Sequence, residues 1–103
     1  PKIQPLHRNY ETVVPHIFVV RLKGMKNRKE VQQQMLEKGI QVGYHYQPNH
    51  CLSFYKNSQQ DHLPVTNTVF PELLSLPIHP DLSESDVYYI ATELINILKC
   101  KNV

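Results

Sequence analysis

The sequence predicts an α+β fold: a small two-layer sandwich in which helices pack on one face of a short, mainly antiparallel sheet of about three strands. Three observations lead to this prediction. The run HIFVVRL, from His16 to Leu22, is β-branched and aromatic, as in a strand. Apolar residues recur at helical spacing in two later stretches, and further short apolar runs lie between those stretches. A chain of 103 residues is long enough for one domain with one core.

The first half of the chain is predicted to contain an arm, a strand, a helix and a second strand. Residues 1–15 are polar and flanked by prolines, so we expect an entering arm, extended around residues 12–14. After the strand at His16–Leu22, the pattern becomes helical from Asn27, a typical N-cap residue, to Lys38, and Gly39 stands where a helix end needs positive φ. Apolar and polar residues then alternate from Ile40 to Tyr46, which predicts a strand.

The second half of the chain is predicted to end in a long helix from Ser83 to Lys99. Ser83 and Asp86 resemble a capping box, acidic residues occupy the first turn, and Lys99 lies in the last turn. Before this helix we expect a helical turn at His50–Tyr55, a polar loop at Lys56–His62, a weak helix at Val65–Leu74, a short strand at Leu74–Ile78 and a turn at His79–Asp81.

The composition argues against several classes of protein. The net charge is only +2, and the densest basic cluster, Lys23 to Lys29, reads as a solvated helix start, so we expect no nucleic-acid binding. No apolar run approaches the ~20 residues of a membrane span. Nothing in the sequence brings Cys51 and Cys100 together, and no secretory signal is visible, so the expected compartment is the cytoplasm. Because the first residue is Pro1, we expect a processed chain or a piece of a longer one.

The segment from Gly39 to Tyr55 is the best candidate for contact with a ligand. It contains two histidines, three tyrosines, a cysteine and a proline. A metal site is a weaker alternative, because the spacing of the possible ligands matches no paired metal motif; these ligands are His45, His50, Cys51, His62 and His79. A hydrolase built on the Cys51 thiol is weaker still, because neighbouring residues rarely act as nucleophile and base for each other. The segment therefore resembles one wall of a site whose chemistry lies elsewhere.

Two motifs give the chain a resemblance to a known family. One is HY-x-P-x-H, formed by His45, Tyr46, Pro48 and His50; the other is SLP-x-HPDLS, from Ser75 to Ser83. Together they resemble the C-terminal small domain of DegT-type sugar aminotransferases, which are pyridoxal-phosphate enzymes of the aspartate aminotransferase fold acting on keto-sugar nucleotides. The resemblance covers about residues 16–98.

The resemblance implies that the active site is formed by two parts, this chain and a large domain that it lacks. Residues 16–99 would be the small domain, after the arm at 1–15 and before a tail at 100–103. The family's Schiff-base lysine and most ligands of pyridoxal phosphate belong to the large domain. This chain alone is therefore expected to bind no cofactor, to contribute no catalytic residue and to be inactive. The resemblance maps His45, Tyr46 and His50 onto the wall that contacts the sugar nucleotide, with pyridoxal phosphate present only in the complete enzyme, a homodimer.

Two other functions remain open at this point. The chain could be a non-enzymatic module that binds a sugar nucleotide or dimerises through the surface that a large domain would otherwise cover. Much more weakly, its histidines could make it a small metal-binding protein. On the main hypothesis, the large domain is part of the same chain or of a separate one.

Overall fold

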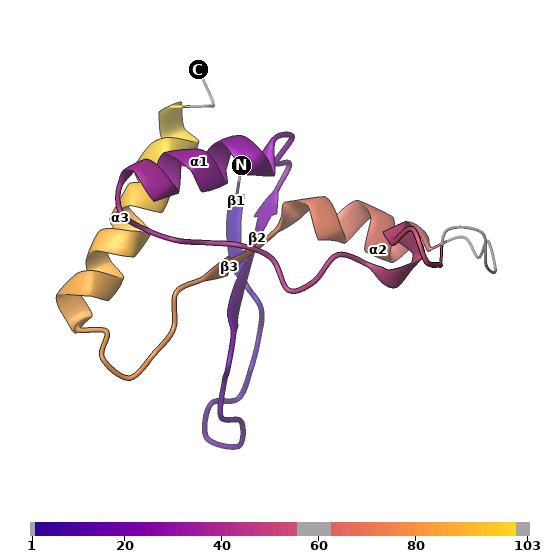
Figure 1. Cartoon of the computed structure of the whole chain (residues 1–103). Helices are drawn as coiled ribbons and strands as arrows, with labels where there is room; N and C mark the ends of the chain where they lie inside the picture. The colour runs from indigo at the N-terminus through magenta and orange to yellow at the C-terminus, as the bar shows by residue number, and fades with distance from the viewer. Residues whose placement is uncertain (1, 56–62, 101–103) are drawn as a thin grey trace.

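A three-stranded antiparallel sheet in the order β1-β2-β3 organises the fold, as the computed structural model in Figure 1 shows for residues 2–55 and 63–100. The strands are β1 (Lys2–Pro5), β2 (Phe18–Lys23) and β3 (Leu73–Leu76). Ile3 of β1 lies opposite Leu22 of β2, and Val20 of β2 lies opposite Leu74 of β3. The predicted α+β class with a short antiparallel sheet is confirmed.

Two helices, α1 (Arg28–Glu37) and α3 (Glu84–Cys100), lie together on one side of the sheet (Figure 1). The main core forms between them and the sheet. Its buried members are Val20, Leu22, Val31, Met35, Ile40, Leu74, Ile90, Leu94, Ile97 and Leu98. Three short helices complete the described elements: η1 (Asn49–Cys51), α2 (Pro64–Val69) and η2 (Phe70–Glu72). None of these three short helices contains a buried residue, and α2 extends from the sheet away from α1 and α3 (Figure 1).

The predicted ends of the two long helices are confirmed. The Asn27 side chain accepts a hydrogen bond from the backbone N–H of Glu30, so Asn27 caps α1. Gly39, with φ of +79°, follows that helix in the left-handed conformation that glycine adopts readily. Ser83 and Asp86 form the expected reciprocal capping box before α3: Ser83 N donates to Asp86 Oδ2 at 3.0 Å, and Asp86 N donates to Ser83 Oγ at 3.1 Å.

The predicted strand at Ile40–Tyr46 is wrong. This segment pairs with the sheet only at Gly43, which forms an isolated antiparallel bridge with Ser75. Only Ile40 of the apolar positions is buried, at 4 % exposed, and its backbone N–H donates to Met35 O; Tyr44 and Tyr46 are exposed. The third strand of the sheet is instead β1, in the part of the chain that was expected to be an arm extended only around residues 12–14.

The other predicted elements are shifted by a few residues. The weak helix expected at 65–74 is divided into α2 and η2, and β3 begins at Leu73 and ends before Pro77, which has no N–H for a ladder bond. The helical turn expected at 50–55 is the shorter η1. The expected loop at 56–62 lies outside the described residues. Among the described residues, no helix is both long and apolar enough to cross a membrane.

Candidate functional site

The candidate segment is attached to the outer edge of β3 by backbone hydrogen bonds. Gly43 N donates to Ser75 O at 3.2 Å, and Ser75 N donates to Gly43 O at 2.7 Å. Because β2 occupies the other edge of β3, this pair extends the sheet by one residue on its open side. A side-chain contact follows two residues later, where His45 Nδ1 lies 3.0 Å from Ser75 Oγ. Ser75 therefore holds both the backbone and the imidazole of this segment.

His45 and Tyr46 have rings in contact but line different hollows. The peptide bond between them is cis, and their rings meet edge to face with centroids 4.9 Å apart. His45 lines a cavity of about 340 Å³ together with His16, Gln41 and Ser75. Tyr46, which is 80 % exposed, lines a second cavity of about 340 Å³ against Phe70 and residues of α2.

His50 is joined to α2 instead of to the other two predicted residues. It lies in η1, and its Nε2 is 2.8 Å from Asn67 Oδ1 on α2. The structure thus brings His45 and Tyr46 together and gives His50 a separate partner.

Arg28, expected on the solvated side of a helix start, is partly buried beside the candidate segment. Its Nη1 donates to the carbonyl oxygens of Phe70, at 2.6 Å, and Leu73, at 3.0 Å. The guanidinium carbon lies 4.1 Å from the ring centroid of Tyr44 and 4.4 Å from that of Phe70. Burial lowers the pKa of Arg28, and the nearby Tyr44 opposes this shift in part. Arg28 therefore links the start of α1 to the segment that contains Tyr46 and to the start of β3.

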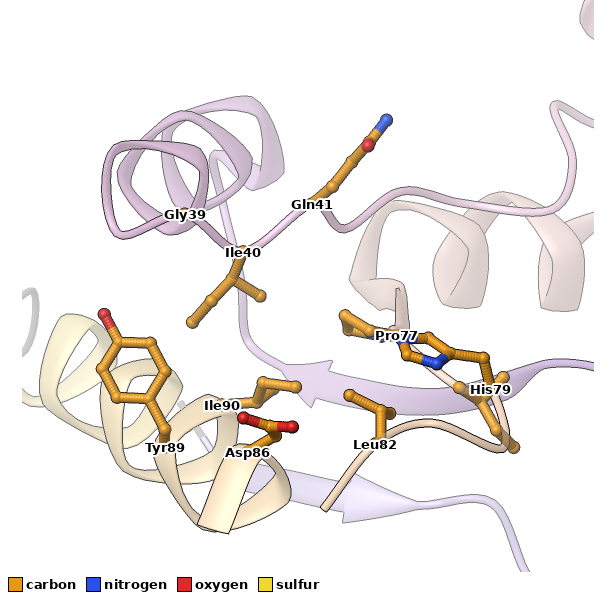
Figure 2. A pocket seen from close by; sticks show the side chains of 10 residues that line it. Gly39, Ile40, Gln41, Pro77, His79, Leu82, Asp86, Tyr89 and Ile90 are labelled. Carbon is orange, nitrogen blue, oxygen red and sulfur yellow. The ribbon is translucent and has the colours of Figure 1, made fainter. Parts of the chain in front are cut away.

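A cavity of about 590 Å³ lies next to the His45 cavity, between residues 39–41 and the first turns of α3 (Figure 2). The two cavities share Gln41, Pro77 and Ile78 in their linings. Two polar side chains of the larger cavity, those of Asp86 and Tyr89, serve the fold. Asp86 accepts hydrogen bonds from Ser83, which lower the pKa of that carboxyl group, and the Tyr89 hydroxyl donates to Lys38 O at 2.9 Å. None of the three predicted substrate residues lines this cavity.

The residues around the His45 and Tyr46 cavities do not fit pyridoxal phosphate by themselves. Neither lining contains a lysine that could form a Schiff base, nor an aspartate or glutamate that could hold the pyridine nitrogen. Lysines in the described ranges are exposed. In residues 2–55 and 63–100, no three His, Cys, Asp or Glu side chains are grouped as metal ligands, and the Cys51 and Cys100 thiols are free and exposed.

Comparison with known proteins identifies relatives along most of the chain. It is 37% identical over 73 residues to the dTDP-3-amino-3,6-dideoxy-alpha-D-galactopyranose transaminase of Aneurinibacillus thermoaerophilus, a match that covers 70% of this chain and 19% of that protein. It is 38% identical over 66 residues to the dTDP-4-dehydro-2,3,6-trideoxy-D-glucose 4-aminotransferase of Saccharopolyspora spinosa, covering 64% of this chain and 17% of that protein. The chain thus spans less than a fifth of the length of these relatives.

A solved structure agrees with these matches. The PLP form of the putative sugar aminotransferase Spr1654 from Streptococcus pneumoniae superposes with a TM-score of 0.70 and 30% identity, over 90% of this chain and 26% of that one. The sequence profile of the DegT/DnrJ/EryC1/StrS aminotransferase family matches residues 1–95. The chain therefore belongs to the DegT/DnrJ/EryC1/StrS aminotransferase family.

Proposed function

We propose that this chain is the C-terminal small domain of a pyridoxal-phosphate-dependent aminotransferase that acts on a keto-sugar nucleotide. The observation that carries the proposal is the family match over residues 1–95, combined with coverage of less than a fifth of the relatives' length. The small domain is residues 16–99, and β1, from the preceding arm, completes its sheet. A large domain, on the same or a separate chain, supplies the Schiff-base lysine, and the complete enzyme is a cytoplasmic homodimer.

Three side chains of this domain form the substrate-side wall of the active site. The His45 imidazole donates a hydrogen bond to a hydroxyl or phosphate oxygen of the sugar nucleotide, and the exposed Tyr46 offers both a ring face and a hydroxyl. His50 contributes from the η1 side, with α2 as its support. Pyridoxal phosphate supplies the electron sink for amino-group transfer when it is bound in the complete enzyme. The chain's own contribution is to bind and orient the substrate.

Sequencing the DNA upstream of the codon for Pro1 tests the proposal most directly. We expect a sequence that encodes a pyridoxal-phosphate-binding domain with its lysine, either in frame or in a neighbouring gene. If neither position encodes such a domain, the proposal of an aminotransferase half is wrong.

Reduction with borohydride tests the expectation that the chain alone is inactive. The 103-residue chain is mixed with pyridoxal phosphate, reduced and digested, and the peptides are mapped by mass spectrometry. We expect no stoichiometric adduct at a single lysine, because no lysine lines the cavities beside His45 or Tyr46. Such an adduct would contradict the assignment of the lysine to another domain.

One observation favours a second candidate, a non-enzymatic dimerisation module. A groove of about 510 Å³ with a mainly apolar lining runs along the sheet and α3, and Phe18, Leu76, Val87 and Ala91 contribute to it. A chain that forms a stable dimer through this groove, without any gene for a large domain, would support the module over the enzyme half.

A further inference from the structure

Ser75 differs from the other residues of β3 in burying a polar side chain. β3 has the sequence Leu-Leu-Ser-Leu, and Ser75 is only 5 % exposed. Its Oγ lies 3.0 Å from His45 Nδ1, and the structure gives it no other hydrogen-bond partner within residues 2–55 and 63–100. A buried hydroxyl without a partner would cost free energy, so this contact satisfies a group that the strand would otherwise bury unpaired.

The burial of Ser75 determines the direction of this hydrogen bond. A serine hydroxyl has one proton to donate, and the acceptor available to it is His45 Nδ1. If Nδ1 were protonated instead, it would donate to Oγ, and the buried Ser75 proton would lack an acceptor. Neutral His45 therefore carries its proton on Nε2.

Three contacts constrain the ring of His45, which is itself an exposed residue. The backbone pair between Gly43 and Ser75 sets where the segment leaves the sheet, with N···O distances of 3.2 and 2.7 Å. The Ser75 hydroxyl holds Nδ1, and the edge of the Tyr46 ring meets the imidazole at an interplanar angle of 85°. The remaining nitrogen, Nε2, has no hydrogen-bond partner among the described residues, although the side chain lines a cavity of about 340 Å³.

We propose that Ser75 is a positioning residue that fixes the tautomer and the orientation of His45, so that its Nε2–H is available as a hydrogen-bond donor to a ligand in the cavity beside β3. A donor at this place is suited to the oxygen atoms of phosphate and sugar hydroxyl groups. The role of this donor in substrate binding rests on the proposed function, but the action of Ser75 on His45 does not.

Nitrogen NMR of the full chain labelled with 15N-histidine tests the action of Ser75. The His45 signals are assigned with the variant His45→Gln, and the ratio of the Nε2–H to the Nδ1–H tautomer is measured in the wild type and in Ser75→Ala. We expect Nε2–H to dominate in the wild type. The ratio should fall about fivefold in Ser75→Ala, which is the bias that one net hydrogen bond gives.

Two further variants keep this test independent of general effects on the fold. Ser75→Cys retains the approximate size of the side chain and replaces the hydroxyl with a weaker donor, so its ratio should lie between those of wild type and Ser75→Ala. Ser53→Ala removes an exposed hydroxyl elsewhere and should leave the ratio unchanged. A dominant Nδ1–H form in the wild type, or a ratio that stays within twofold of wild type in both Ser75 variants, would overturn the proposal.

Titration with dTDP-glucose of the enzyme completed by its large domain separates this inference from the proposed function. If both are right, His45→Gln and Ser75→Ala each weaken binding, by about fivefold for Ser75→Ala, and the double variant binds no more weakly than His45→Gln. If the tautomer ratio shifts while neither single variant changes binding, Ser75 still orients His45, and the substrate-wall proposal is the one that fails.

Discussion

Arg21 and Glu72 form an ion pair that joins the central strand of the sheet to the turn before β3. Arg21 Nε donates to Glu72 Oε2 at 2.6 Å, and the two side chains are 27% and 14% exposed. This hydrogen bond is the main cause that lowers the pKa of Glu72 from its usual 4.5, and the backbone N–H of Gly24 adds to the shift. The folded state therefore holds the charged carboxylate more favourably than the unfolded chain does.

The first prediction concerns how this pair responds to acid. A lowered folded pKa gives stability that is present above about pH 4.5 and is lost as the pH falls through the folded pKa of Glu72. We expect urea unfolding of wild type, Glu72→Gln, Arg21→Gln and the double variant to give a favourable coupling energy at pH 7 that disappears near pH 2. The control combines Arg21→Gln with Glu11→Gln, since Glu11 is an exposed residue of the N-terminal segment 1–15. This pair should give no coupling energy at either pH. A coupling between Arg21 and Glu72 that persists in strong acid would contradict this account.

Some of the candidate site could be predicted at the scale of single residues. The sequence motif identified His45, Tyr46 and His50 as a group, but it could not identify their supporting partners. Ser75 lies 30 positions from His45, and Asn67 lies 17 positions from His50. The two carbonyl groups that Arg28 binds are 42 and 45 positions away from it. Such contacts depend on how the elements pack, and no local pattern encodes them. A serine inside an otherwise apolar strand was the one available signal for Ser75.

At the scale of elements, local patterns predicted the two long helices well. They failed for two segments of the sheet region, residues 40–46 and β1. Caps and helical periodicity are local, so the ends of α1 and α3 follow directly from the sequence. The alternation from Ile40 to Tyr46 predicted a strand, but a local pattern does not by itself provide a pairing partner, and the segment pairs with the sheet only at Gly43. Strand β1 shows the reverse case, a segment that pairs without a recognisable pattern. Its sequence, Lys-Ile-Gln-Pro, carries no strand pattern, yet its backbone pairs with β2 and forms one edge of the sheet.

The second prediction tests the capping box of α3. Replacing Ser83 with alanine removes the acceptor for the Asp86 backbone N–H and should lower the free energy of unfolding by about 1 kcal/mol. Ser53→Ala, at an exposed serine outside α3, is the control and should change it by less than about 0.5 kcal/mol. Ser85 is unsuitable as a control because its hydroxyl lies 2.9 Å from Ser83 Oγ. Chemical denaturation of the three proteins at neutral pH measures both differences. Equal losses in the two variants would mean that the cap does not hold the helix start.

At the scale of the whole molecule, the chain is broader than a single compact domain of its length. Its radius of gyration is 15.3 Å, compared with about 13 Å expected for 100 residues. Part of the difference arises because α2 extends away from the two-layer sandwich (Figure 1). We call residues 46–55 and 63–69 the α2 arm. It has no buried residue and carries strongly exposed apolar side chains, among them Phe54, at 85 % exposed, and Val65, at 74 %.

The third prediction follows from this separation between the sandwich and the α2 arm. The double variant Phe54→Ser and Val65→Thr should leave the free energy of unfolding within about 0.5 kcal/mol of wild type, because neither side chain belongs to the core. Leu22→Ala, at a position that is 0 % exposed, should lower it by about 2–5 kcal/mol.

The same double variant should also reduce self-association, measured by sedimentation velocity, since exposed apolar patches favour contact between molecules. Val14→Thr provides the matched control, because Val14 is 94 % exposed but lies outside the α2 arm, and we expect it to associate like wild type. If the double variant Phe54→Ser and Val65→Thr lost as much stability as Leu22→Ala, the α2 arm would have to pack against the sandwich in solution. If the double variant kept both its stability and its self-association, the surface responsible for self-association would lie outside the α2 arm. The apolar groove along α3 would then be the next surface to alter.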